Sequence, residues 1–152
     1  MNLKDYIRSI QDYPKKDILF RDITTLIKNE NAFAETIDQI VERSRKFNFT
    51  KIAAIESRGF VFASAVSYIL KKPFIMLRKK NKLPADVHSI DFELEYGTAT
   101  IEVHKDSIDY NDNVLIIDDL IATGGTAEAG AKLIEISGGK VAAFIFVINL
   151  FD

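Results

Sequence analysis

Four apolar runs, spaced along the chain, limit its fold more than any other feature. They cover residues 51–55, 73–79, 113–118 and 140–150, and segments with helical spacing or turn-forming residues lie between them. Strands that are continuous apolar runs are usually buried on both faces, as in a parallel sheet covered by helices. The sequence therefore predicts an α/β fold with a mostly parallel central sheet flanked by helices.

The segments before the first run predict smaller elements. Apolar residues at helical spacing predict a short amphipathic helix over residues 2–11, which Pro14 ends. Residues 18–27 could be extended or turn-like, and Asn31 is the predicted N-cap of a helix that reaches about Phe47.

Later segments predict two longer helices and a hairpin. The helices cover residues 60–70 and 125–136, and the alternating residues 92–104 predict a hairpin that turns at Gly97. The polar residues 79–91 have no core pattern. We therefore expect a loop there, and a loop of this length in a compact domain often acts as a lid.

Composition narrows the class of protein. The chain has 152 residues, 47% hydrophobic and 28% charged, with a net charge of −2 and no cysteine. This length suits one domain, residues 1–152, and the charge gives no reason to expect nucleic-acid or membrane partners. No apolar run is long enough to span a bilayer, and the N-terminus lacks the apolar core of a signal peptide. We therefore expect a cytoplasmic protein without disulfides.

Residues 114–126, VLIIDDLIATGGT, contain the most informative motif. The apolar residues 114–117 predict a strand that ends at the carboxyl edge of the sheet, where α/β folds bind ligands. The glycines and the helix start can surround an anion with backbone N–H groups, and Asp118 and Asp119 can accept hydrogen bonds from a vicinal diol. The lysine of an ATP-binding P-loop and the G-x-G-x-x-G pattern are both absent. The motif predicts a site for ribose 5-phosphate, and a Gly-rich turn with an aspartate cap is the alternative.

This motif resembles the signature of the type I phosphoribosyltransferases, which is four apolar residues, two acids, an apolar spacer and TGGT. In that family the loop binds the 5-phosphate of phosphoribosyl pyrophosphate (PRPP), and the acids contact the ribose hydroxyls. The resemblance implies the family's fold, with a small N-terminal hood at residues 1–27 and a flexible β-hairpin flap at residues 79–97. It implies catalytic roles for Asp118 and Asp119, and phosphate binding by Ala122, Thr123, Gly124, Gly125 and Thr126.

Another segment is similar to the adenine-specific members of this family. ILFRDIT, residues 18–24, resembles the segment that covers the purine. The resemblance implies that Phe20 stacks on adenine, with Leu19 and Arg21 beside it. The alternative is a buried phenylalanine next to a surface ion pair between Arg21 and Asp22.

Two more segments support the same branch of the family. IESRGF resembles the pyrophosphate-binding turn, which implies this role for Ser57 and Arg58, and a solvated Glu56–Arg58 pair is the alternative. RKKNKLP followed by LEYG resembles the flap, which implies that Lys82 meets the pyrophosphate and that Glu95 is a catalytic carboxylate near the base. The alternative for Glu95 is a strand residue that faces water.

The resemblance implies a reaction and its partners. The expected reaction transfers ribose 5-phosphate from PRPP to N9 of adenine and releases AMP and pyrophosphate, as in purine salvage. Mg²⁺ would be carried by PRPP rather than by direct protein ligands. His88 and His104 are expected at the surface or in the flap rather than as metal ligands. A homodimer is also implied.

Departures from the family's pattern bear on the function. Residues 14–17 are Pro-Lys-Lys-Asp where the family has P-x-P-G, and Asn149 stands where a glutamate is common. The sequence stops at Asp152, which leaves open a missing strand or dimer contact, or a shortened and inactive product. A transferase for hypoxanthine, xanthine or orotate would share the same motifs, and so would a regulator that binds PRPP without catalysis.

Overall fold

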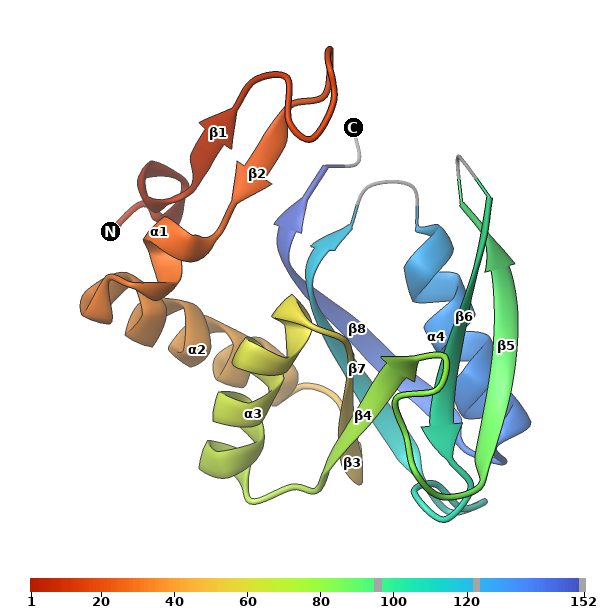
Figure 1. Cartoon of the computed structure of the whole chain (residues 1–152). Helices are drawn as coiled ribbons and strands as arrows, with labels where there is room; N and C mark the ends of the chain where they lie inside the picture. The colour runs from red at the N-terminus through yellow and green to blue at the C-terminus, as the bar shows by residue number, and fades with distance from the viewer. Residues whose placement is uncertain (95–96, 122–123, 151–152) are drawn as a thin grey trace. The chain divides into compact units, whose positions relative to one another are not determined.

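A computed structural model describes residues 1–94, 97–121 and 124–150, which form two compact units, Met1–Glu42 and Arg43–Asp152 (Figure 1). The first unit contains a two-stranded antiparallel sheet followed by helices. Its elements are η1 (Leu3–Tyr6), β1 (Arg8–Ile10), β2 (Phe20–Asp22), α1 (Thr24–Ile27) and α2 (Glu30–Ser44), whose last two residues belong to the second unit.

The helix expected over residues 2–11 is wrong. Only a 3₁₀ turn forms, with the side chain of Asn2 accepting a hydrogen bond from the backbone N–H of Lys4, and the chain then enters β1. Arg8 on β1 lies opposite Asp22 on β2 and forms an ion pair with it at 2.5 Å. This partner comes from a distant segment, so pairing between strands overrides the helical spacing of a short stretch.

The long helix α2 begins earlier than expected. The side chain of Asn29 accepts a hydrogen bond from the backbone N–H of Ala32 at 2.9 Å, which is the N-cap interaction that the sequence pattern predicted for Asn31. Asn31 instead lies inside the helix, and the helix ends at Ser44 rather than near Phe47.

The second unit is built on a six-stranded sheet with the order β5-β6-β4-β3-β7-β8. Strands β4, β3, β7 and β8 are parallel, whereas β5 and β6 form an antiparallel hairpin at one edge. The mostly parallel sheet is therefore confirmed. The strands are β3 (Lys51–Ile55), β4 (Phe74–Lys79), β5 (Val87–Glu93), β6 (Thr98–His104), β7 (Asn113–Ile121) and β8 (Lys140–Asn149).

Helices α3 (Arg58–Leu70) and α4 (Gly125–Ile136) cover opposite faces of this sheet. A Cβ placed on Gly59 of α3 would lie 3.4 Å from the Cβ of Ala54, and one placed on Gly130 of α4 would lie 3.2 Å from the Cδ1 of Ile55. Ala54 and Ile55 are neighbours on β3, so their side chains point to opposite faces. The two helices bury the apolar runs on both sides, as predicted.

The polar segment 79–91 differs from the expected loop. Strand β5 already begins at Val87, so only residues 80–86 connect it to β4, and the hairpin is longer than the predicted 92–104. Residues 88–91 alternate between partly buried and exposed positions at the edge of the sheet, and their polar side chains give the sequence no apolar run that would indicate a strand. Among the described residues, no helix is long and apolar enough to cross a membrane.

Candidate active site

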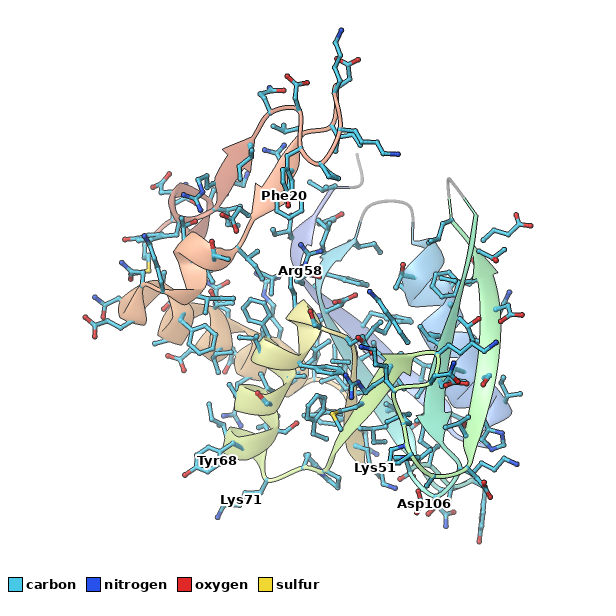
Figure 2. All side chains as sticks on the ribbon, viewed as in Figure 1. Phe20, Lys51, Arg58, Tyr68, Lys71 and Asp106 are labelled. Atoms are coloured by element: carbon cyan, nitrogen blue, oxygen red, sulfur yellow. The ribbon has the colours of Figure 1, made fainter. Side chains whose placement is uncertain are left out.

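Asp118 and Asp119 lie near the carboxyl end of β7, between β3 and β8. The backbone N–H of Asp119 donates to the Oδ1 of Asp118 at 2.8 Å, so the Asp118 side chain is held against the backbone of the next residue. Arg58, which Figure 2 labels, is the first residue of α3. Its Nε lies 2.8 Å from the Oδ2 of Asp119. The fold thus brings together the acids and the arginine, which belong to separate motifs in the sequence.

The two acids differ in their electrostatic environment. Burial, together with the negative charge of Asp119, raises the pKa of Asp118 from 3.8 to about 7. Asp119 is only 7% exposed but faces the guanidinium of Arg58. The pair therefore holds a carboxyl group that changes charge near neutral pH beside a carboxylate that is already paired.

The residue after Arg58 must be small. A Cβ on Gly59 would lie 2.8 Å from the Oδ1 of Asp118 and 3.2 Å from the carbonyl oxygen of Ile117. This close approach lets the first turn of α3 sit directly against the end of β7. The glycine in the IESRGF motif is therefore explained by the position of the acid pair.

The acid pair opens into two adjoining pockets. One has a volume of about 480 Å³ and the other of about 590 Å³. They share four lining residues, so they are parts of one cleft: Ile55, Glu56, Lys79 and Thr126. Ser57, Arg58 and both acids line the first part, whereas Lys80 and Lys82 line the second. The predicted pyrophosphate residues thus lie in the same cleft as the acids.

Glu56 does not form the alternative pair with Arg58. Its Oε1 accepts hydrogen bonds from the Nε of Arg78 at 3.2 Å and from the backbone N–H of Lys79 at 2.6 Å. Glu56 therefore holds the end of β4 and leaves Arg58 to pair with Asp119. The Nε of Arg58 is directed toward Asp119, while the rest of its side chain remains 47% exposed in the cleft.

The start of α4 lies at the same cleft. Gly124 is its N-cap and has a φ of 88°, a left-handed conformation that glycine adopts most easily. Gly125 begins the helix, and Thr126 lines both parts of the cleft. A helix N-terminus favours an anion, so this end of α4 suits a phosphate group. The predicted phosphate residues Ala122 and Thr123, and the predicted catalytic Glu95, lie outside the described residues.

The residues predicted to contact adenine lie in the first unit. Leu19 is 39% exposed, and Phe20 is partly buried with its ring in an edge contact with Tyr13 at 5.1 Å between centroids. Arg21 donates to the Oγ of Ser9 at 2.6 Å. The alternative Arg21–Asp22 ion pair is wrong, because Asp22 pairs with Arg8.

Sequence reasoning missed two lysines of the cleft and one supporting side chain. Lys79 lines both parts of the cleft and Lys80 lines one, and the run of basic residues from Arg78 was the available signal. Glu102 on β6 accepts a hydrogen bond from the backbone N–H of Asn81, which follows this run, and no motif in the sequence points to Glu102.

His104 accepts a hydrogen bond from the backbone N–H of Ala85 at 3.2 Å. In the part of the chain that the structure describes, no three His, Asp or Glu side chains are grouped to hold a metal ion.

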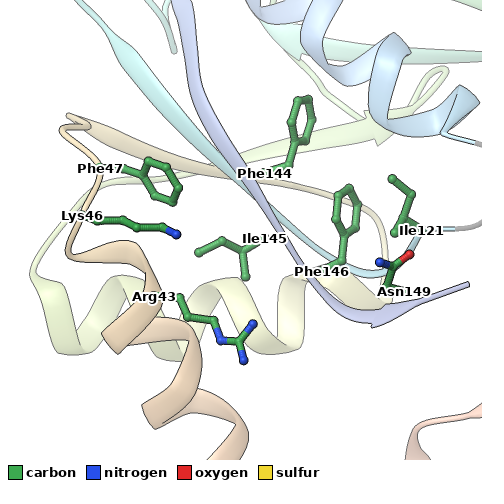
Figure 3. Close-up of a pocket in the computed structure, with 8 residues that line it drawn as sticks. All are labelled: Arg43, Lys46, Phe47, Ile121, Phe144, Ile145, Phe146 and Asn149. Carbon is green, nitrogen blue, oxygen red and sulfur yellow. The ribbon is translucent and has the colours of Figure 1, made fainter. Parts of the chain in front are cut away.

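A separate pocket of about 510 Å³ lies along β8 (Figure 3). Phe144 and Phe146 stack on one side of this strand, and Ile145 lies on the other side toward Arg43 and Lys46. Neither acid lines this pocket, so it is not part of the cleft that holds Asp118 and Asp119.

Comparison with known proteins agrees with this geometry. A phosphoribosyl transferase domain matches residues 22–149, so the chain belongs to the phosphoribosyltransferase family. It is 80% identical over 152 residues to the adenine phosphoribosyltransferase of Pelagibacter ubique (strain HTCC1062), which covers the whole chain and 87% of that protein. It is 49% identical to that of Agathobacter rectalis, over 97% of this chain and 85% of the relative. Within the family, the chain belongs to the adenine phosphoribosyltransferases.

Solved structures place it in the same group. The adenine phosphoribosyltransferase of Thermoanaerobacter pseudethanolicus superposes with a TM-score of 0.91 at 40% identity, covering 97% of each chain. The Saccharomyces cerevisiae enzyme, solved with an imino-altritol bisphosphate and adenine, has a TM-score of 0.91 at 33% identity, covering 97% of this chain and 86% of that one. The type I phosphoribosyltransferase fold expected from the sequence is therefore confirmed.

Proposed function

We propose that this chain transfers the 5-phosphoribosyl group from PRPP to N9 of adenine, giving AMP and pyrophosphate in purine salvage. The observation that carries the proposal is the single cleft in which Asp118, Asp119 and Arg58 adjoin a lysine-lined pocket and the N-terminus of α4. Such a cleft can bind the hydroxyls of a sugar, with one phosphorylated group on each side of that sugar.

The sugar and its 5-phosphate are held by β7 and α4 in this proposal. Asp118 and Asp119 accept hydrogen bonds from the ribose hydroxyls, and the 5-phosphate binds at the start of α4 through Gly124, Gly125 and Thr126. Fixing the ribose at both ends aligns its C1 with the base, which is a large part of the catalytic effect in transfer reactions. Ala122 and Thr123 are proposed to complete the phosphate loop.

The leaving group is bound by cations from two separate segments. As the bond between C1 and pyrophosphate breaks, positive charge develops on the sugar and negative charge on the departing oxygen. Ser57 and Arg58 meet the pyrophosphate from one side and Lys82 from the other. The ion pair between Arg58 and Asp119 fixes the direction of the guanidinium, which reduces the reorganisation needed in the transition state.

The base-side contacts remain predictions. Glu95 is proposed to handle the proton of adenine or to polarise the ring, and Phe20 to stack on it, with Leu19 and Arg21 beside it. The exposure of Leu19 and the partial exposure of Phe20 support this proposal, since both present apolar surface that a planar base can cover.

Mg²⁺ is the proposed cofactor. Mg²⁺ prefers oxygen ligands and retains several waters. Asp118 and Asp119 supply carboxylate oxygens beside the cleft, and one of them already pairs with Arg58, which fits an ion held mainly by the PRPP oxygens. When bound, the ion would neutralise charge on the pyrophosphate.

A base screen tests the proposal. The protein is incubated with PRPP, Mg²⁺ and adenine, hypoxanthine, xanthine or orotate, and nucleotides are quantified by chromatography. We expect AMP from adenine and little product from the other bases. The Asp119→Asn variant should lose roughly 100-fold or more in kcat/KM, because the carboxylate that orients Arg58 and the ribose is lost. Asp106→Asn, an exposed carboxylate on a distant loop, is the matched control (Figure 2). Preference for another base, or full activity of Asp119→Asn, would contradict the proposal.

A homodimer in the cytoplasm is the proposed state. The outer face of α3 exposes Val61 (38%), Tyr68 (85%) and Ile69 (48%), at spacings that place them on one side of the helix. Exposed apolar residues on one side of a helix support a protein–protein contact. Light scattering of the parent and of Tyr68→Lys tests it, since the variant should shift toward monomer.

A further inference from the structure

Glu102 is a buried carboxylate that the proposed reaction does not use. It lies on β6, is 7% exposed, and is directly opposite both Ser89 on β5 and Arg78 on β4 in the sheet register. It thus sits where β4 ends and the connection of residues 80–86, here called the lysine loop, begins. An acidic side chain at this position needs a physical reason, because it lies near a cleft proposed to bind polyanions.

The two oxygens of Glu102 hold the two sides of the lysine loop. Oε1 accepts a hydrogen bond from the backbone N–H of Asn81 at 2.9 Å, and Oε2 accepts one from the Oγ of Ser89 at 2.5 Å. Asn81 stands at the start of the loop and has a φ of 67°, whereas Ser89 stands on the strand that follows it. One carboxylate therefore connects the start of the loop with the strand that follows it.

Other bonds lay the loop along the end of β6 (Figure 1). The backbone N–H of Ala85 donates to the Nε2 of His104, and the backbone N–H of Lys105 donates to the carbonyl oxygen of Asp86 at 2.9 Å. The arch between these ties contains Lys82, whose backbone N–H donates to the carbonyl oxygen of Lys79 at 3.3 Å. Lys80 directly precedes the anchored Asn81, and it lines the cleft together with Lys82.

The charge of Glu102 argues for a positional role. The hydroxyl of Ser89, and then the backbone N–H of Asn81, hold the pKa of Glu102 below its usual range. It is therefore an anion at neutral pH, close to Lys79, Lys80 and the cleft they line. A nearby negative charge weakens binding of a polyanion. If charge alone mattered, removal of Glu102 would improve binding of PRPP.

We propose that Glu102 is a positioning residue for the leaving-group site, which clasps Asn81 and Ser89 so that the lysine loop presents Lys80 and Lys82 to the pyrophosphate of PRPP. The inference rests on the proposed function for the identity of the ligand. It adds a residue that touches no substrate and acts only through the loop it holds.

Three variants separate position from charge. Glu102→Ala removes both hydrogen bonds, and we expect the KM for PRPP to rise roughly 10-fold while kcat at saturating PRPP changes far less. Glu102→Gln removes the charge but keeps an oxygen for Asn81 and a partner for Ser89, so its KM should stay near the parental value. Asp91→Ala is the matched control, because Asp91 bonds Thr100 on the same hairpin at 2.6 Å without touching the loop.

Amide hydrogen exchange provides a reading that does not depend on turnover. A peptide covering the lysine loop should exchange faster in Glu102→Ala than in the parent, and not in Asp91→Ala or Glu102→Gln. Calorimetric binding of inorganic pyrophosphate should weaken in parallel. If no base were converted to a nucleotide, the proposed function would fail, but these two measurements would still test the clasp.

Several results would contradict the positioning role of Glu102. A KM for PRPP or an affinity for pyrophosphate that is unchanged or improved in Glu102→Ala would overturn it, as would equal effects of the alanine and glutamine variants. If Glu102→Ala did not fold, Ser89→Ala would replace it, since this change removes one of the two bonds at the edge of the sheet. Ser89→Ala should then raise the KM for PRPP by several-fold, and no change would refute the role.

Discussion

Replacing Asp118 with asparagine should stabilise the protein at alkaline pH while weakening its activity. The pKa of Asp118 is raised from 3.8 to about 7 by burial and by the charge of Asp119. The native chain therefore binds a proton that the unfolded chain releases between about pH 4 and pH 7. Stability is lost as the pH rises through this window, and an asparagine, which is never ionised, avoids that loss.

The size of the effect follows from the shift. The difference, 7 − 3.8, is roughly 3 units, and at about 1.4 kcal/mol per unit the ionised carboxylate costs at most about 4 kcal/mol above pH 8. Asp118 borders an open cleft, so solvent screening halves this to about 2 kcal/mol. At pH 5 the native carboxyl is mostly neutral, and the same reasoning leaves under about 1 kcal/mol.

Thermal unfolding at two pH values measures this prediction. For a domain of this size, about 2 kcal/mol corresponds to a rise in Tm of roughly 4–8 °C. Asp118→Asn should therefore exceed the parent by that amount at pH 8 and by much less at pH 5. Asparagine keeps an oxygen to accept the backbone N–H of Asp119, so packing changes little. Asp106→Asn is the control and should shift Tm little at either pH. An equal difference at both pH values would refute the electrostatic reasoning.

Three further changes have defined outcomes. Gly59→Ala should cost about 1–3 kcal/mol in unfolding free energy and lower activity, because its Cβ would lie 2.8 Å from Asp118; parental activity would contradict the close approach. Asn29→Ala should cost about 1 kcal/mol in urea unfolding through loss of the N-cap, whereas Asn31→Ala should cost much less. Asp22→Asn should lower the free energy of unfolding at pH 7, and by less toward pH 2. The reason is that a hydrogen bond from the backbone N–H of Thr24 lowers the pKa of Asp22 to about 2. A loss of stability that does not depend on pH would contradict this reasoning.

The fold was predictable where an apolar pattern within one segment determines the helix or strand. Strand β3 and helix α4 have the predicted bounds, 51–55 and 125–136, because each buries a full face against its neighbours. Residues 2–11 were not predictable, since the partner of Arg8 comes from a strand that begins ten residues after β1 ends. The strand at residues 87–91 was missed because its polar side chains lie at an edge, where one face meets solvent.

The site was predictable to the extent that it lies in contiguous motifs. Asp118, Asp119 and Arg58 were identified from two short segments, and the structure joins them through one ion pair. Glu102 was not identifiable, because its role depends on bonds to Asn81 and Ser89 that register between strands creates. A glutamate that alternates with apolar residues on a strand is equally typical of a solvent-facing side chain.

The acid pair shows why stability and activity should separate in this protein. Asp118 is held in a half-buried position beside a second carboxylate, and the absent side chain of Gly59 makes room for it. That arrangement costs free energy in the unliganded chain, since Arg58 is paired with Asp119 and only partly offsets the charge of Asp118. In the proposed function, a ribose diol donates hydrogen bonds to the acids and relieves this cost only when it is bound. The free-energy cost of the ionised Asp118 thus lowers folding stability and is relieved on binding. A variant that removes this cost, such as Asp118→Asn, should be more stable and bind PRPP less tightly.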